Sequence, residues 1–272
     1  MSELGVSSLP RELLDAQAHG TPVSVPPSAR EGGLSLDAAY AVEAELRRMR
    51  RETGRRTVGR KVGFANRAMW RVLKLQTLVW ASMYDDTVRD APGGHASLST
   101  AGTYSPRLEP EVVFKLKAVP ASAEAPAVLD AVEWLALGFE VVDCPFPDWK
   151  FQPVDFVACF GFHAALVVGE PRPVERGDVG ALAERLAALT VRLRRNGELV
   201  EEGYGKNALR SPALCLGELA SAIAGRFDAE PLAPGELIST GTLTAAQPIA
   251  AGERWSVEAD GLDLPGLTLD LT

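Results

Sequence analysis

The chain has 272 residues, of which 46% are hydrophobic and 24% are charged, proportions that suit one large globular domain or a domain with a small appendage. Its formal net charge of −8 argues against a nucleic-acid-binding surface, which needs clustered lysines and arginines. The sequence shows no secretory signal and no apolar run that could span a bilayer, and its three cysteines form no C-x-x-C pair, so we expect a cytoplasmic protein with no membrane, zinc or disulfide component.

The N-terminal part, residues 1–55, is predicted to form a small helical cap. A short helix is expected from Leu9 to His19. The segment Val23–Ser28 reads as an extended linker, because its two consecutive prolines do not fit inside a helix. A longer helix is expected to begin at Ser35, a favourable N-cap, and to stop at Gly54.

Residues 56–272 are predicted to form a catalytic body rich in β-strands. Its first strand, 58–64, carries Gly59 and Gly63, and glycines inside a strand often mark a close approach by backbone or ligand. Lys61 lies between them. It is either an edge-strand lysine that deters aggregation or a pocket lysine that polarises an oxygen or moves a proton.

Three further segments are predicted on either side of the strand that carries Glu109 and Glu111. Asn66 is expected to cap a short helix that runs through Leu73. Residues 81–90 are expected to form a loop. Residues 127–137 are expected to form a helix that Gly138 ends.

The acidic strand contains two glutamates, Glu109 and Glu111, just before the alternating apolar run Val112–Leu116. Because they are two residues apart in extended backbone, they share one face with Cα atoms roughly 6.6 Å apart, close enough to hold one ion between them. Two adjacent like charges are unfavourable without a cation or a proton. The alternative is a solvent-facing edge strand with acidic residues.

A third glutamate, Glu140, lies in the apolar strand 139–143. A buried carboxylate without a partner costs several kcal/mol, so Glu140 needs a cation, a proton, a hydrogen-bond network or an exposed position. It is the natural third ligand if Glu109 and Glu111 hold a metal ion.

The remaining segments complete a strand-rich pattern. Residues 148–155 read as a polar loop leading into a long strand, 156–168, in which Cys159 is more typical of a buried hydrophobe than of a nucleophile, and His163 of a hydrogen-bonded histidine than of a catalyst. Asn196-Gly197 predicts a β-hairpin. Many strands with few helices favour a closed or rolled β-architecture with helices outside.

These pieces together resemble the fumarylacetoacetate hydrolase superfamily, in particular its branch of 2-keto-4-pentenoate hydratases and 4-oxalocrotonate decarboxylases. The resemblance runs from the helix at Ser35 to the C-terminus. It rests on the order and spacing of five motifs: the lysine strand 59–64, the R-x-E-x-E motif 107–111, the strand 139–143, the segment 148–155 and the T-G-[ST]-L loop within 239–244.

The resemblance implies an α+β fold, a mixed β-roll with peripheral helices and a small N-terminal helical cap. It also implies a divalent cation, Mg²⁺ or Mn²⁺, and a homo-oligomer, and it makes a complex with a related lyase a further option. Carried over residue by residue, it assigns Glu109, Glu111 and Glu140 as metal ligands, Lys61 and Asp155 as catalytic residues, and Thr240, Gly241, Thr242 and Phe160 as substrate-binding residues.

The chain departs from that branch at one position that concerns chemistry. Where the branch usually carries an Asp-Asn pair, this sequence has Cys159-Phe160, so a thiol and an aromatic ring replace polar groups. It also lacks a match for the His/Glu pair of the C–C hydrolases. We therefore expect a metal-dependent lyase acting on a small 2-oxo or 2-hydroxy-dienoic acid, with a hydratase as the leading interpretation. The alternatives are a 2-oxo-acid decarboxylase of the same branch, which would share the enolate intermediate, a ligand-binding homologue without activity, and a subunit that activates a partner enzyme.

Overall fold

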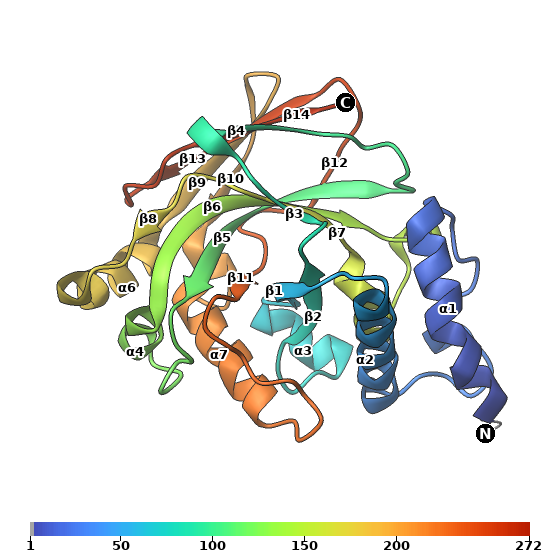
Figure 1. The fold of residues 1–272 in the computed structure, drawn as a ribbon. Coiled ribbons are helices and arrows are strands. Elements are labelled where there is room, and N and C mark those ends of the chain that lie inside the picture. Colours follow the sequence, from blue (N-terminus) through green and yellow to red (C-terminus); the bar gives the residue numbers. More distant parts are fainter. Residues whose placement is uncertain (1–2) are drawn as a thin grey trace.

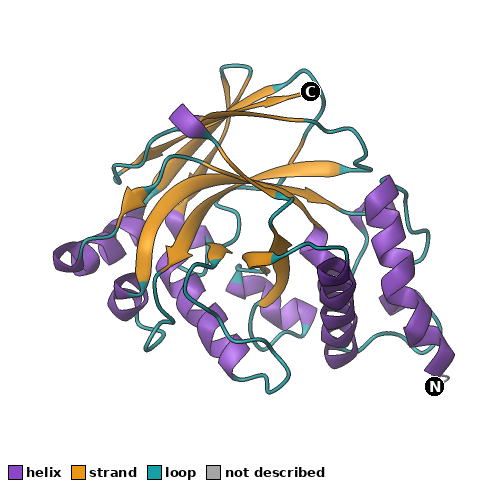
Figure 2. Cartoon of the chain, viewed as in Figure 1, coloured by secondary structure: helices purple, strands orange, loops and turns teal. Residues whose placement is uncertain are grey.

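The computed structural model describes residues 3–272, with side chains from residue 8 onward. Two curled β-sheets dominate it, and helices lie outside them (Figures 1 and 2), so the predicted α+β class is confirmed. The larger sheet has the order β2 (Val79–Tyr84), β1 (Thr57–Gly63), β11 (Leu237–Ser239), β5 (Pro106–Leu116), β6 (Val132–Asp143), β7 (His163–Val168) and β3 (Val88–Asp90), with β12 (Gln247–Pro248) paired to β5 and β8 (Arg172–Pro173) paired to β6.

The smaller sheet and the helices complete the architecture. The smaller sheet has the order β10 (Glu198–Tyr204), β9 (Thr190–Arg195), β13 (Arg254–Asp260), β14 (Leu267–Leu271) and β4 (His95–Leu98). The α-helices are α1 (Glu3–His19), α2 (Leu36–Glu52), α3 (Arg67–Leu73), α4 (Ala125–Asp130), α5 (Pro153–Ala158), α6 (Val179–Ala188) and α7 (Pro212–Ala224). Helices α4, α6 and α7 pack together at one end of the long strands, and α1 and α2 pack together at the other (Figure 1).

The long antiparallel pair β5–β6 forms the centre of the larger sheet. Its register places Glu109 opposite Glu140. Strand β1 runs parallel to β11 and places Lys61 beside Ser239, while β11 runs antiparallel to β5. Four strands therefore bring residues that are far apart in the sequence to one region of the sheet.

The glycines of β1 mark close contacts, as predicted. A side chain at Gly59 would collide with the carbonyl oxygen of Leu237 in β11, and one at Gly63 would collide with the ring of Phe156. The tight packing at both positions holds β1 against β11 and α5, and so fixes the position of Lys61 between them.

The N-terminal helices contact the sheets through buried polar groups. Glu43 of α2 is buried and accepts hydrogen bonds from the backbone N–H and the hydroxyl of Ser82 in β2, at 3.2 and 2.7 Å. It also pairs with Arg47 at 3.0 Å. Such buried, charge-assisted bonds tie α2 to the edge of the larger sheet.

Three sequence predictions of secondary structure were wrong. Residues 81–90 are not a loop, because β2 continues to Tyr84 and β3 follows at 88–90. Residues 127–137 are not one helix, because α4 ends at Asp130 and Val132 already begins β6. Strands that are buried on both faces lack the alternation that identifies a strand, and pairing with β5 outweighs the local preference for helix.

The third error concerns residues 156–168, the predicted long strand. The structure has helix α5, then a 3₁₀ turn at Phe160–Phe162, and only then β7 from His163. Helix α5 begins with Pro153 at its first position, a favourable place for proline. The backbone N–H of Gln152 donates to Asp155 at 2.8 Å and helps to fix that helix start.

Other local predictions are confirmed. Asn66 caps α3 by accepting from the N–H of Ala68 at 3.0 Å, and Ser35 caps α2. The turn between β9 and β10 has Asn196 at φ 54° and Gly197 at φ 87°, the left-handed pair that an Asn-Gly hairpin requires. Among residues 3–272, no helix is both long enough and apolar enough to cross a membrane.

Candidate metal centre and substrate cavity

Three glutamates from neighbouring strands meet at one point. Glu109 and Glu111 lie on β5 and Glu140 on β6, and each offers one carboxylate oxygen within 4.8 Å of the others. The geometry follows from the strands: residues two apart share a face, and Glu140 is the direct cross-strand partner of Glu109. Glu111 and Glu140 are fully buried, and Glu109 is half-buried.

Each buried glutamate has one oxygen that protein donors hold. Glu111 Oε2 accepts from the N–H of Gly241 at 2.8 Å and from the hydroxyl of Ser239. Glu140 Oε1 accepts from His163 Nδ1 at 2.8 Å. These bonds come from the T-G loop and from β7, and they orient the two carboxylates.

The other oxygen of each buried glutamate has no aligned hydrogen-bond donor. Glu111 Oε1 and Glu140 Oε2 are both buried and without a hydrogen-bond partner. Lys61 Nζ lies 3.0 Å from Glu140 Oε2, which makes an ion pair without the direction of a hydrogen bond. Buried polar atoms in folded proteins are nearly always hydrogen-bonded, so two such oxygens in one cluster indicate a site for a ligand.

The electrostatics of the cluster favour an additional positive charge. Burial, together with the charge of Glu140, raises the pKa of Glu109 to about 7 and the pKa of Glu111 well above its ordinary value. Burial also acts to raise the pKa of Glu140, but Lys61 and His163 outweigh it and hold that pKa low. Burial acts to lower the pKa of Lys61, and the surrounding carboxylates raise it instead.

The donor set fits a hard divalent cation. The cluster offers carboxylate oxygens and no sulfur or imidazole nitrogen that faces the same point, which is the ligand chemistry of Mg²⁺ and Mn²⁺. Such an ion would supply a partner for Glu111 Oε1, a second partner for Glu140 Oε2 beside Lys61, and a positive charge against three carboxylates.

A cavity of about 440 Å³ opens beside the cluster. Lys61 and Glu109 line it at one side, together with Gly241 and Thr242 of the loop after β11. Aromatic side chains line much of the rest: Phe64, Trp149, Phe151, Phe156 and Phe162. A concave space with a few polar groups and apolar walls is the usual form of a small-molecule site.

The structure brings together most of the residues that the sequence assigned to the site, but three of them lie elsewhere. Thr240 is buried, and its hydroxyl donates to the carbonyl oxygen of Val112 at 2.8 Å, so it does not line the cavity. Phe160 packs edge-on against Tyr84, with ring centroids 6.4 Å apart. In this segment it is Phe162 that faces the cavity.

Asp155 also lies outside the cavity lining, and its carboxylate is engaged by backbone and side-chain donors. It accepts from the N–H and the hydroxyl of Ser28 at 2.7 and 2.6 Å, and from the N–H of Gln152. In this structure Asp155 therefore caps α5 and ties the N-terminal segment to it.

Three residues of the site were not singled out as such from the sequence. Ser239 binds Glu111, Phe162 lines the cavity, and His163 binds Glu140. His163 was correctly expected to be hydrogen-bonded, but nothing in the sequence identifies its partner, because that contact depends on the register of β7 against β6.

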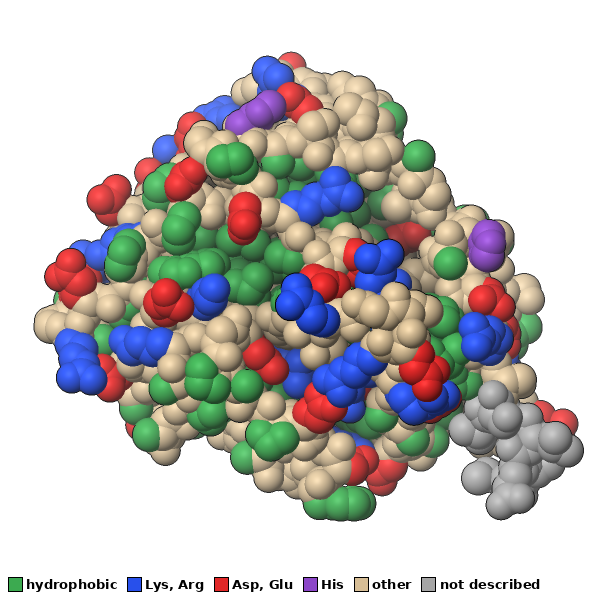
Figure 3. Space-filling view, viewed as in Figure 1, with side chains coloured by type: hydrophobic (Ala, Val, Ile, Leu, Met, Phe, Trp, Pro, Cys, Tyr) green, Lys and Arg blue, Asp and Glu red, His purple; other side chains and the backbone are tan. Residues whose placement is uncertain are grey.

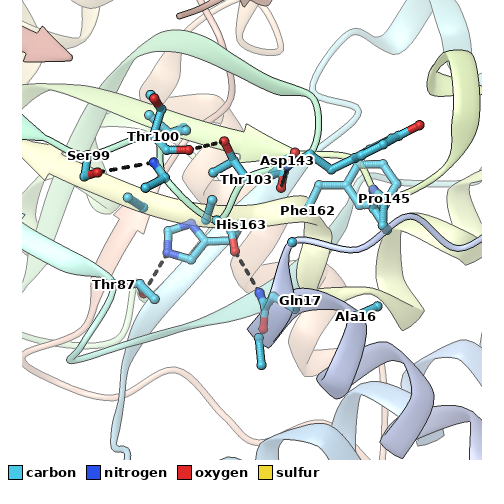
Figure 4. Close-up of a pocket in the computed structure, with 18 of the residues that line it drawn as sticks. Ala16, Gln17, Thr87, Ser99, Thr100, Thr103, Asp143, Pro145, Phe162 and His163 are labelled. Atoms are coloured by element: carbon cyan, nitrogen blue, oxygen red, sulfur yellow. Dashed lines mark hydrogen bonds between the residues drawn. The ribbon is translucent and has the colours of Figure 1, made fainter. Parts of the chain in front are cut away.

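A second cavity, of about 280 Å³, lies on the other side of His163 (Figure 4). His163 Nε2 lies 2.9 Å from the hydroxyl of Thr87, and Gln17 of α1 donates to the carbonyl oxygen of His163 at 3.2 Å. Phe162 lines both cavities. His163 therefore lies between this cavity and Glu140, and both of its ring nitrogens have a polar partner, Glu140 at Nδ1 and Thr87 at Nε2.

The curled α+β roll, with buried acidic groups beside a cavity, is the arrangement of an enzyme that acts on a small molecule. The chain belongs to the fumarylacetoacetate hydrolase family, because residues 87–265 match the family model described as Fumarylacetoacetate (FAA) hydrolase C-terminal. The resemblance expected from the sequence is confirmed.

Its curated relatives are lyases of two kinds. The chain is 30% identical over 234 residues to a 2-hydroxyhexa-2,4-dienoate hydratase of Comamonas testosteroni, covering 84% of each chain. It is also 30% identical over 232 residues to a 4-oxalocrotonate decarboxylase of Pseudomonas sp. (strain CF600), covering 84% of this chain and 83% of the relative.

Solved structures show the same fold. The 4-oxalocrotonate decarboxylase from Pseudomonas putida G7, complexed with magnesium and adipate, superposes with a TM-score of 0.86 at 24% identity. The match covers 100% of this chain and 99% of that one, so the shared fold includes the N-terminal helices.

Proposed function

We propose that the protein is a Mg²⁺- or Mn²⁺-dependent hydratase of a 2-hydroxy-2,4-dienoate, with Glu109, Glu111 and Glu140 as the metal ligands. The observation that carries this proposal is the convergence of the three glutamates beside the cavity, where Glu111 Oε1 has no hydrogen-bond partner and Glu140 Oε2 has only its ion pair with Lys61. A hydratase among the 30% identical relatives supports the reaction type.

The reaction would consist of an isomerisation by two proton transfers, followed by the addition of water. The proton of the 2-hydroxyl leaves and C5 gains one, which gives a 2-oxo-3-enoate; water then adds, its oxygen bonding to C4 and a proton to C3. A bound divalent cation would act as a Lewis acid on the 2-oxygen and the carboxylate. Lys61 lines the cavity as an ammonium group among carboxylates, so it is placed to hold negative charge at the 2-oxygen or to deliver a proton.

The cavity favours a hydratase over a decarboxylase of diacids. A diacid needs a cation at the far end of the site for its second carboxylate, because a buried charge without a partner is costly. Among the described residues that line the cavity, Lys61 is the one basic side chain, and it is paired with Glu140. Away from the cluster, the cavity is lined by one further charged residue among those described, Glu201, which would repel a carboxylate.

The test is a metal-dependent assay with both substrate types. Purified protein with Mg²⁺ is expected to consume 2-hydroxypenta-2,4-dienoate, seen as loss of the dienol absorbance, and a chelator should stop the reaction until Mg²⁺ or Mn²⁺ is restored. A 2-oxo diacid should react far more slowly. Turnover of the diacid with no turnover of the dienoate would make the protein a decarboxylase, and no metal-dependent turnover of either would refute the proposal.

His163 is expected to position Glu140. Because a carboxylate only accepts, His163 Nδ1 must carry the hydrogen of their 2.8 Å bond. Replacing His163 with Leu leaves Glu140 Oε1 without a donor, and we expect Mg²⁺ affinity to fall by about 10- to 100-fold, as is typical for partners of metal ligands. His163→Asn, whose amide can donate in place of Nδ1, should recover much of the affinity in a calorimetric titration with Mg²⁺. Equal affinity in the wild type and His163→Leu would contradict this role.

A further inference from the structure

Five aromatic rings that line the cavity also contact one another. We call Phe64, Trp149, Phe151, Phe156 and Phe162 the aromatic wall. Neighbouring rings in it lie 4.6 to 6.4 Å apart between centroids, mostly in edge-to-face contact. Such contacts fix the position of each ring relative to the others. The wall is therefore a preformed apolar surface rather than a set of loose side chains.

Phe162 is the central member of the wall. It contacts Trp149, Phe151 and Phe156, with centroid separations of 6.1, 4.6 and 5.3 Å. Phe162 is the last of three consecutive residues in the left-handed region, with φ values of 53°, 60° and 56° at residues 160, 161 and 162. Non-glycine residues rarely adopt this conformation, and such backbone strain is often found where a side chain must be presented to a site.

The surroundings of this turn hold it in place. A side chain at Gly161 would lie 2.9 Å from the Cβ of Ala81, so the turn packs directly against β2. The turn points Phe160 into the core against Tyr84 and Phe162 towards the cavity.

The cavity is lined by polar as well as aromatic side chains. Lys61, Glu109 and Thr242 line it, and so do Asn66, Glu201 and Asn207. Lys61 Nζ lies 5.0 Å from the centre of the Phe156 ring, so the aromatic wall begins directly beside the acidic cluster. A substrate whose carboxylate and 2-oxygen are held at the glutamate cluster would therefore have the aromatic wall within reach of its other end.

We propose that the aromatic wall selects 2-hydroxy-2,4-dienoates that carry a large apolar group at the end remote from the carboxylate, an aryl ring or an extended alkyl chain, over the unsubstituted five-carbon acid. The inference rests on the proposed function, since it needs the acid end to be held at the glutamate cluster. The cavity of about 440 Å³ lies within the range of roughly 300–1,000 Å³ seen for sites of drug-sized ligands. A short acid would leave the wall in contact with water, whereas an apolar group would displace that water.

The experiment measures binding of unreactive 2-oxo acids to the Mg²⁺-loaded protein by calorimetry. We expect 2-oxo-4-phenylbutanoate to bind at least tenfold more tightly than 2-oxobutanoate, since each buried methylene alone is worth about a fourfold gain. Phe162→Ala should remove most of this gain, measured as the ratio of the affinities of the two acids for the same variant. Phe151→Leu, at a half-buried position of the wall, gives a milder version of the same change if Phe162→Ala does not fold.

Phe114→Leu is the matched control, because Phe114 is a buried core residue outside the cavity lining, and it should keep the full preference for the phenyl acid. If 2-oxobutanoate binds and the phenyl acid binds no more tightly, the inference is wrong while the proposed function stands. The inference is also wrong if Phe162→Ala and Phe151→Leu both retain the full preference. If neither acid binds in the presence of Mg²⁺, the proposed function fails and the inference fails with it.

Discussion

Replacing Glu140 with Gln is expected to abolish divalent metal binding and turnover together. The substitution keeps the size of the side chain and removes the charge at the centre of the cluster. Glu140 is fully buried, 3.0 Å from Lys61 and 2.8 Å from His163. Loss of a residue that hydrogen-bonds to a metal ligand already lowers metal affinity by about 10- to 100-fold, so loss of a ligand itself should lower it by more than roughly 100-fold. Calorimetry with Mg²⁺ and the dienol assay measure the two effects separately.

The control for this variant is Glu43→Gln. Glu43 is also buried and also holds a cation, Arg47, at 3.0 Å, but it lies between α2 and β2. Both variants remove a buried, paired carboxylate, and both should lower the melting temperature. Only Glu140→Gln should lose Mg²⁺ binding. If Glu140→Gln binds Mg²⁺ as the wild type does, the cluster is a structural ion-pair network and the metal assignment is wrong.

The face of the molecule shown in Figure 3 has no basic area of the kind that binds nucleic acid. On the face shown in Figure 3, lysines and arginines are interspersed with aspartates and glutamates and form no continuous basic area there. The formal net charge of −8 agrees with that picture.

The convergence of the three acids could be predicted because it depends on short-range rules. Residues two apart on a strand share a face, which fixes Glu109 and Glu111 as neighbours. Glu140 followed from the cost of a buried unpaired carboxylate, and the register of β5 and β6 places it directly opposite Glu109. That these acids bind a metal stays a prediction.

What could not be predicted depends on contacts that are distant in the sequence. Strand β2 is buried along its whole length, so the alternation that identifies a strand is hidden. The start of β6 follows α4 after one residue, so the local sequence reads as one continuous helix. The left-handed turn at 160–162 decides which phenylalanine reaches the cavity, and two of its three residues are not glycine, so the local sequence gives little sign of it. Asp155 shows the converse case, since a residue that matches a catalytic motif forms hydrogen bonds that cap a helix.

Replacing Lys61 with Met is expected to separate catalysis from metal binding. Met has a similar length and keeps the apolar contacts of the lysine stem, but it cannot donate or carry charge. Turnover should fall by about 10²- to 10⁴-fold, the range typical for a general acid or base. Mg²⁺ affinity should be retained or increased, because the ammonium group that competes with the metal for Glu140 is gone.

The same variant has a second signature in stability. Without Lys61, the three carboxylates lose the ammonium group that pairs with Glu140, so the metal-free protein should melt at a lower temperature than the wild type. Mg²⁺ should then raise the melting temperature by more in Lys61→Met than in the wild type, because it alone neutralises the cluster. A turnover rate equal to that of the wild type would exclude Lys61 from the chemistry.

Arg60→Met supplies the matched comparison. Arg60 immediately precedes Lys61 on β1 and is equally buried. Its guanidinium group lies 3.4 Å from the carboxylate of Glu236, outside the acidic cluster. Its loss should lower the melting temperature with and without Mg²⁺ by similar amounts, since its partner is not a proposed metal ligand. If the melting temperature responds more to Mg²⁺ in Lys61→Met than in Arg60→Met, Lys61 belongs to the active centre. A lysine that only compensates buried acids would give no such difference. If both variants respond to Mg²⁺ alike, the coupling between Lys61 and the metal site is absent.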